Sequence, residues 1–162
     1  MSIFQNLKRV IQDPKKLTTY HTGLIQAKAY RVMKKRTTEL LAPYGISTVE
    51  WALLGLLHDQ KQGIRSLEVS ELLGVEQPFI TVLVKKLKAK GYVDDRKDPL
   101  DARAKLLVIG EKGKKFVPVV EKMLRTEMRP LLKGLGIKDV LTYLNVLYSI
   151  VENSTKANKT ND

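Results

Sequence analysis

The sequence contains no cysteine, and this absence removes several kinds of chemistry at once. Disulfide bonds, thiolate zinc sites, thiol catalysis and thiol redox sensing are all excluded. Histidine is also scarce, and His21 and His58 lie too far apart to give a metal-ligand spacing. We therefore expect neither a metal site nor a cofactor.

Long hydrophobic runs are missing as well. The densest apolar stretch, "WALLGLL" at residues 51–57, is far shorter than the about 20 residues that a membrane span needs. Lys8 and Arg9 interrupt the N-terminal segment, so it does not resemble a signal peptide. No nucleophile elbow, phosphate loop or metal triad occurs, which argues against an enzyme. These absences predict a soluble, cytoplasmic protein.

What is abundant is positive charge. The chain of 162 residues has 29 Lys and Arg against 17 Asp and Glu, a formal net charge of +12. Such an excess attracts nucleic acid, an anionic membrane or an acidic partner, without choosing among them. The length suits one domain with an appended assembly element, and 43% hydrophobic residues suffice for a core.

Local signals predict a mainly helical chain. Apolar residues recur at helical spacing over residues 17–41, and the breaker "PYG" at 43–45 ends that helix. Ser47 and Glu50 form a capping box, with Ile46 and Trp51 at the two staple positions around it. A second helix is therefore expected over residues 47–58.

Two further short helices follow. Ser66 is placed to cap a helix that runs to residue 73, and Gly74 supplies its left-handed stop. The next helix spans residues 76–90, and its buried stripe follows the i, i+3, i+4, i+7 rule: Ile80, Leu83, Val84 and Leu87. Two short helices joined by a glycine-containing turn are the helix-turn-helix pattern.

A β-hairpin is predicted next, with strands at residues 92–96 and 104–109 around the charged loop. Gly110 is an acceptable N-cap for a helix over residues 111–132, in which Pro118 should either kink the axis or sit in the early turns. A last helix carries an apolar face of Val140, Leu141, Leu144, Leu147, Tyr148 and Val151. The polar residues 153–162 are expected to form a flexible tail.

A helix-turn-helix followed by a β-hairpin is a winged helix, and its exposed groups can enter DNA grooves. Asp101 is placed to brace the Arg103 guanidinium for a narrow minor groove; alternatively, their pairing only stabilises the turn. The lysines of residues 76–90 also allow the interpretation of a merely solvated helix face. The predicted DNA-binding residues are Gln77, Pro78, Thr81, Lys85 and Lys88 on the helix, and Arg96, Lys97, Asp101 and Arg103 on the wing.

Residues 73–113 resemble the recognition helix and wing of the MarR family, the multiple-antibiotic-resistance type of regulators. The segment "DPLDAR" matches the D-x-R wing signature of that family. The resemblance covers nearly the whole of residues 1–162 and implies an obligate homodimer on pseudo-palindromic duplex DNA. It assigns residues 46–110 to the winged helix-turn-helix lobe, and residues 1–42 and 111–152 to dimerisation helices.

The chain departs from the family pattern at the base-reading helix. Val82 stands where an arginine is common, Glu76 replaces a frequent serine, and Phe79 replaces a frequent threonine. Gly110 replaces a capping threonine after the wing. Base readout is therefore expected to depend more on the other exposed residues of this helix.

Many relatives bind small aromatic or phenolic anions between the dimerisation helices and the DNA-binding lobe. By position, the candidates for an effector site here are Tyr20, His21, Tyr30, Tyr44 and Trp51. An alternative remains open, because Trp51 is explained as a staple and core residue and Tyr20 lies on an apolar stripe.

The function that follows is a homodimeric transcription regulator. It would bind double-stranded DNA sequence-specifically as a repressor and be released by a small aromatic or anionic effector. The alternative is a winged-helix module that binds protein rather than DNA. Val82 and Phe79, apolar where polar groups are usual, favour that second hypothesis.

Overall fold

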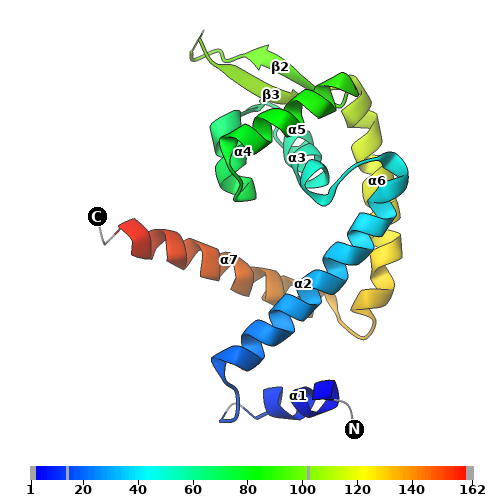
Figure 1. The fold of residues 1–162 in the computed structure, drawn as a ribbon, viewed down its shortest axis with the longest axis vertical. Coiled ribbons are helices and arrows are strands. Elements are labelled where there is room, and N and C mark those ends of the chain that lie inside the picture. The colour runs from blue at the N-terminus through cyan, green and yellow to red at the C-terminus, as the bar shows by residue number, and fades with distance from the viewer. Residues whose placement is uncertain (1–2, 14, 102, 160–162) are drawn as a thin grey trace. The chain divides into compact units, whose positions relative to one another are not determined.

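A computed structural model describes residues 3–13, 15–101 and 103–159. The chain divides into two compact units, Met1–Thr126 and Glu127–Asp162. The helices are α1 (Ile3–Ile11), α2 (Thr19–Leu41), α3 (Thr48–Asp59), α4 (Ser66–Leu73), α5 (Gln77–Ala89), α6 (Glu111–Met128) and α7 (Ile137–Lys159), and the strands are β1 (Ile64–Arg65), β2 (Val93–Lys97) and β3 (Lys105–Ile109). The helices dominate, and the wing is small (Figure 1).

The start of α3 confirms the predicted capping box. The Ser47 hydroxyl accepts the Glu50 N–H at 3.2 Å, and the Ser47 N–H donates to Glu50 Oε2 at 2.7 Å. Before it, α2 ends in a 3-10 turn, Ala42–Tyr44, and Gly45 takes a left-handed φ of 61°. The break expected at residues 43–45 is therefore present, and it redirects the chain between α2 and α3.

The helix-turn-helix consists of α4 and α5. Its first cap differs from the prediction, because Arg65, not Ser66, precedes α4 and donates its N–H to Glu68 Oε2 at 3.2 Å. Arg65 is the last residue of a strand and is still extended, so the helix begins one residue earlier than expected. Gly74 is left-handed with a φ of 63°, as predicted for the turn.

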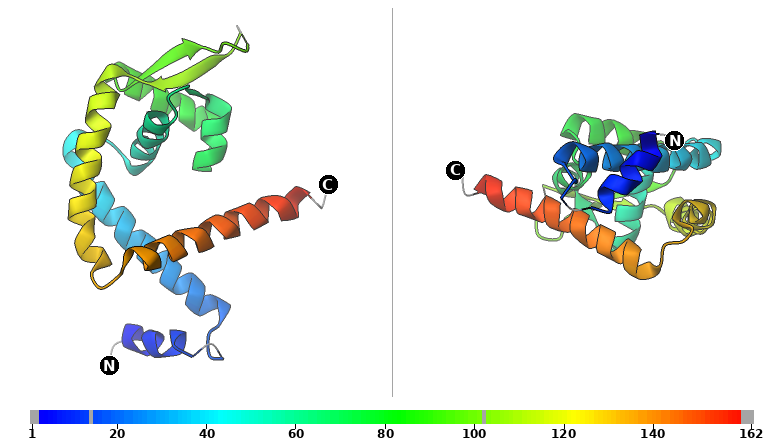
Figure 2. Two further views of the ribbon diagram at one scale, coloured as in Figure 1. Left: turned by 180° about the vertical axis from the view of Figure 1, so that it is seen from behind. Right: turned by 90° about the horizontal axis from the view of Figure 1, so that it is seen from below.

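The wing is an antiparallel hairpin in which each strand begins one residue later than predicted. Val93 pairs with Ile109 at its base and Lys97 with Lys105 near its tip. The two-residue strand β1, which was not predicted, pairs with β3 and gives the order β1-β3-β2. Two views of the chain show the hairpin projecting beyond the neighbouring helices (Figures 1 and 2).

One hydrophobic core holds the lobe together. The predicted stripe of α5 is buried in full, and Ile80 and Leu87 are completely enclosed. They lie in one cluster with Leu53 and Leu57 of α3 and with Val93 of the wing. Because helix α5 and the hairpin share this core, the orientation of each depends on the other.

The helix after the wing is shorter than predicted. It ends at Met128 and continues as a 3-10 turn, Arg129–Leu132. Pro130 explains the change, since it lacks an N–H and disfavours helical backbone in the residue before it. At the other end, a Cβ at Gly110 would lie 2.8 Å from the Gly91 carbonyl oxygen, so the replacement of threonine there serves close packing.

The tail expected from residue 153 is helical as far as Lys159, and residues 160–162 lie outside the described residues. Local contacts account for the longer helix. The hydroxyls of Ser154 and Thr155 donate to the Val151 carbonyl, and Glu152 pairs with Lys156 at 3.4 Å. Polar composition alone therefore gave the wrong end point for this helix.

Neither a single membrane-spanning helix nor a metal-ligand cluster is found in the part of the chain that the structure describes. No one helix combines the length and apolarity that a span requires, although Thr19–Tyr44 with Thr48–Asp59, bent by 80°, meets that requirement as a pair. No group of three or more His, Cys, Asp or Glu side chains is placed to hold a metal ion.

A buried ion pair ties α3 to α5. Glu50 is fully enclosed, and its Oε1 lies 2.9 Å from Lys86 Nζ. Burial alone would raise the pKa of Glu50, but the Ser47 N–H and the Lys86 ammonium more than offset this and hold the pKa below its ordinary value. Glu50 therefore stabilises the fold as a carboxylate, and this contribution is lost as the pH falls through its folded pKa.

Replacing Lys86 with methionine should lower the free energy of unfolding at neutral pH by about 3 kcal/mol, because the buried Glu50 carboxylate loses its counter-charge. In acid the deficit should shrink, since a protonated Glu50 needs no cation. Urea unfolding at the two pH values measures both effects. The control Lys85→Met should change stability little, and an equal loss in both variants would contradict the role of the pair.

Candidate nucleic-acid interface

The outward side of α5 is exposed as predicted. Pro78, Thr81 and Lys85 lie at the surface on the side away from the buried stripe, and Gln77 is exposed in the first turn of the helix. Val82 is also exposed, with 64% of its surface accessible. This side is therefore open to a ligand in the described part of the chain.

The lysines of α5 have different surroundings. Lys86 pairs with Glu50, and Lys90 Nζ donates to the Gly45 carbonyl at 2.7 Å. Lys88 pairs with Asp95 on β2, and only 32% of its side chain is exposed. Among the interactions of the described residues, Lys85 has no partner. The predicted basic helix face is therefore reduced to one unpaired ammonium, while Lys88 fastens the helix to the wing.

The turn of the wing is fastened by a carboxylate that was not among the predicted site residues. Asp98 has a side chain only 5% exposed, and its Oδ2 accepts from Arg65 Nε at 2.9 Å and Nη2 at 2.6 Å. Its Oδ1 accepts the Leu100 N–H at 2.9 Å. The Leu100 N–H and the Arg65 guanidinium hold the pKa of Asp98 below its ordinary value.

Asp101 and Arg103 do interact, but the prediction that Asp101 braces the Arg103 guanidinium is wrong. Asp101 Oδ1 accepts the backbone N–H of Arg103 at 3.0 Å, and the Asp101 carbonyl accepts the Ala104 N–H at 2.9 Å. An aspartate two residues before an arginine reaches the nearby main chain more easily than the long side chain. Asp101 therefore shapes the turn, and the Arg103 guanidinium makes no ion pair with any described residue.

The other two predicted wing residues differ from each other. Arg96 donates its guanidinium N–H to the Gln62 carbonyl and so ties β2 to the loop before β1. Lys97 is exposed at the outer end of β2 and pairs across the hairpin with Lys105 in register. Arg96 therefore supports the wing, whereas Lys97 is the more accessible cation.

Three contributors to this surface were missed by the sequence reasoning: Arg65, Asp95 and Asp98. The run "DDRKD" at residues 94–98 signals a crowd of charges, but no local rule indicates which of them pair. The partner of Asp98 lies 33 residues away in the sequence. Only the pairing of β1 with β3 brings Arg65 to the base of the wing turn.

Among the predicted effector residues, the contacts of the described chain join only Tyr20 and His21, which are neighbours in the sequence. The rings of Tyr20 and His21 contact each other with centroids 4.2 Å apart, and Tyr30 lies under the Lys34 ammonium at 5.6 Å. Trp51 packs instead edge-on against Phe116 at 6.5 Å. Its half-buried position between the two core clusters agrees with the alternative interpretation as a core residue.

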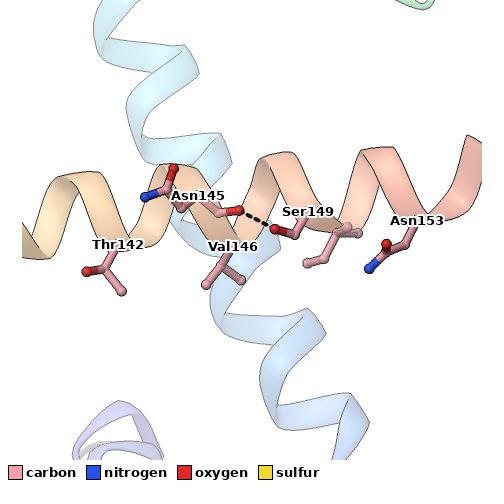
Figure 3. Close-up of a pocket in the computed structure, with 6 residues that line it drawn as sticks. Thr142, Asn145, Val146, Ser149 and Asn153 are labelled. Atoms are coloured by element: carbon pink, nitrogen blue, oxygen red, sulfur yellow. Dashed lines mark hydrogen bonds between the residues drawn. The ribbon is translucent and has the colours of Figure 1, made fainter.

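A hollow of about 380 Å³ lies along α7 in the second unit. All of the residues that line it come from this one helix: Thr142, Asn145, Val146, Ser149, Ile150 and Asn153. In Figure 3 the labelled side chains follow one another along the helix axis, and the Ser149 hydroxyl donates to the Asn145 carbonyl at 2.9 Å. The hollow is an open helix face, and none of the predicted effector residues takes part in it.

The elements of the lobe define its class. Helices α4 and α5, joined at Gly74, are followed by a hairpin fastened to them through Lys88–Asp95 and Arg65–Asp98. The exposed side of α5 and the exposed Arg103 belong to the same unit. This is a winged helix-turn-helix protein.

Comparisons with known proteins narrow this class. A model of the MarR family matches residues 44–104. The uncharacterized HTH-type transcriptional regulator YwoH of Bacillus subtilis (strain 168) is 32% identical over 98 residues, which are 60% of this chain and 70% of that protein. The chain therefore belongs to the MarR family of winged helix-turn-helix transcription regulators.

Solved structures agree on the fold. CouR from Rhodococcus jostii RHA1, bound to p-coumaroyl-CoA, is similar with a TM-score of 0.74 and 22% identity over 80% of this chain and 90% of that chain. The transcriptional repressor CouR bound to a 23-mer DNA duplex gives a TM-score of 0.70 and 22% identity over 80% and 91%. These similarities confirm a mainly helical fold with a small β-wing.

Replacing Asp98 with alanine should loosen the wing turn, because the Leu100 N–H and the Arg65 guanidinium lose their shared acceptor. We expect hydrogen exchange at the Leu100 amide to accelerate at least about tenfold after correction for intrinsic rates. In the unchanged protein, the same protection should weaken as the pH falls through the lowered pKa of Asp98. The control Asp94→Ala, at an exposed carboxylate of β2, should leave this amide unchanged; equal acceleration would contradict the assignment.

Proposed function

We propose that the protein is a homodimeric regulator that binds double-stranded DNA sequence-specifically and represses transcription. The observation that carries the proposal is the pair of unobstructed groups in one unit: the outward side of α5 and the Arg103 guanidinium at the wing. A helix of this kind fits the major groove, and an arginine on a wing fits the minor groove beside it. The proposal includes cytoplasmic action and no catalytic step.

The predicted DNA-binding residues take different parts in this proposal. Gln77, Pro78, Thr81 and Lys85 would face base edges, Arg103 would enter the minor groove, and Lys97 would contact phosphate. Three other predicted residues would act mainly by positioning, since each is held by contacts within the chain: Lys88, Arg96 and Asp101.

Exposed apolar side chains on α7 support the homodimer. Leu141, Leu144, Tyr148 and Val151 lie on one side of the helix and are all more than half exposed. Val146 and Ile150, which line the hollow in Figure 3, are equally exposed on another side. A helix that is apolar on more than one side needs more than one partner surface. We propose that residues 1–42 and 111–152 of two copies provide them.

Release by a small aromatic or anionic effector is the remaining part of the proposal. Its support is the structural similarity to CouR bound to p-coumaroyl-CoA. Tyr20, His21 and Tyr30 on α2 remain the proposed contacts, because aromatic rings and a nearby ammonium suit an aromatic anion. Trp51 would take part only at its exposed edge, since its other side packs in the core.

Replacing Arg103 with alanine should raise the Kd for a specific duplex by about tenfold to a hundredfold, because each half of the dimer loses its minor-groove contact. Fluorescence anisotropy measures this, and the slope of log Kd against log salt should fall because fewer phosphate counterions are released. The control Arg125→Ala removes the same charge from α6 and should change the Kd little. An unchanged Kd in the Arg103 variant would refute the wing contact.

Replacing Leu144 with glutamate should weaken self-association at least about a hundredfold, because each of two copies loses a buried leucine and gains a charge at the interface. Sedimentation equilibrium measures the change, and Trp51 fluorescence reports whether the lobe stays folded. The control Lys138→Glu adds an acid to the first turn of the same helix and should leave a dimer. A monomeric wild-type protein would contradict the proposed assembly.

A further inference from the structure

The centre of the outward side of α5 is apolar. Residues of an α-helix are spaced by about 100°, so Val82 lies nearly opposite the buried Ile80 and Leu87. Val82 is 64% exposed, and the two buried residues are completely enclosed. Pro78, one turn earlier on the same row, is exposed too. The part of the helix that reaches furthest from the core therefore presents hydrocarbon.

Most of the lysines on α5 and at its C-terminal end are engaged in contacts within the chain. Lys86, Lys88 and Lys90 are held by Glu50, Asp95 and the Gly45 carbonyl. Of the helix lysines, Lys85 alone has no partner among the described residues, and the helix has no arginine. Bidentate recognition of guanine by a guanidinium is therefore not available to this helix.

Thr81 adds to the apolar character of the row. Its hydroxyl donates to the Gln77 carbonyl one turn earlier, at 3.1 Å. The hydroxyl hydrogen is therefore used within the helix, and Thr81 can offer a ligand its methyl group and an accepting oxygen, but no donor. In the major groove, thymine alone among the bases displays an apolar group, its C5 methyl.

We infer that Val82 is a specificity-determining residue that packs against the C5 methyl of a thymine in each operator half-site, with the Thr81 methyl beside it. This inference rests on the proposed DNA-binding function and adds the base that is read. Val82 is bordered by the exposed Phe79 and Pro78 on one side and by Thr81 and Lys85 on the other. The apolar area is therefore small and has polar groups beside it, which suits a groove with polar edges better than a broad apolar protein surface.

The test uses deoxyuridine, which differs from thymidine only by the absent methyl group. Wild-type protein first selects a preferred duplex from a randomised library, and each thymine of that duplex is then replaced in turn by deoxyuridine. At one thymine per half-site, we expect the replacement to raise the Kd about fourfold. This factor corresponds to the free energy of burying one methyl-sized group. Val82→Ala removes the contact from both half-sites of the proposed homodimer, so it should raise the Kd of the thymine duplex by about sixteenfold.

The decisive quantity is the ratio of the two Kd values for each protein. In the Val82→Ala variant, the uracil and thymine duplexes should bind equally well. The matched variant Lys85→Ala should keep the fourfold ratio while it binds both duplexes more weakly. Val82→Ala removes only exposed methyl groups and introduces a better helix former, so thermal unfolding should confirm an intact fold.

The outcomes distinguish a failure of the proposed thymine contact from a failure of the proposed DNA-binding function. The thymine contact would be refuted if no deoxyuridine replacement weakened binding. It would also be refuted if the Val82→Ala variant kept the fourfold ratio of the uracil and thymine Kd values. Either result would leave DNA binding itself established. Wild-type protein that selects no duplex and shows no salt-sensitive binding would instead overturn the proposed function itself. A ratio that falls to one only in the Val82 variant would establish the contact.

Discussion

The contact between Lys86 and the enclosed Glu50 determines how α5 is presented. The buried stripe of α5 fixes which side faces the core, but hydrophobic contacts are non-directional and allow a helix to slide or rotate. An ion pair with a carboxylate that is itself held by the Ser47 N–H defines one position along the helix. The capping box of α3 and the placement of α5 are thus two uses of the same carboxylate.

Four lysines of similar sequence context have four different roles in this lobe. Lys86, Lys88 and Lys90 connect α5 to α3, to the wing and to the turn before α3, whereas Lys85 has no partner among the described residues. A net charge of +12 describes the attraction of the whole chain for a polyanion. It does not describe the outward side of α5, which the internal pairs leave poor in free cations.

The sequence predicted what depends on residues close together in the chain. The Ser47–Glu50 box, the Gly74 turn and the buried stripe of α5 each follow from a spacing of one to seven residues, and all are confirmed. The Arg65–Asp98 pair and strand β1 depend on how distant segments meet, and neither was predicted. The brace at Asp101 is a local feature that was nevertheless predicted wrongly, because a spacing of two residues does not tell whether the main chain or the side chain of Arg103 is the partner.

The division of roles separates affinity from discrimination. Phosphate and minor-groove contacts supply binding that depends on salt and little on sequence, and the exposed cations of the wing suit that task. The outward row of α5 has one unpaired ammonium, so it adds little to non-specific attraction. In the proposed complex, hydrocarbon at its centre would favour thymine by contact with the C5 methyl group. Because contacts within the chain engage Lys86, Lys88 and Lys90, we propose that α5 contributes more to the choice among sequences than to overall affinity.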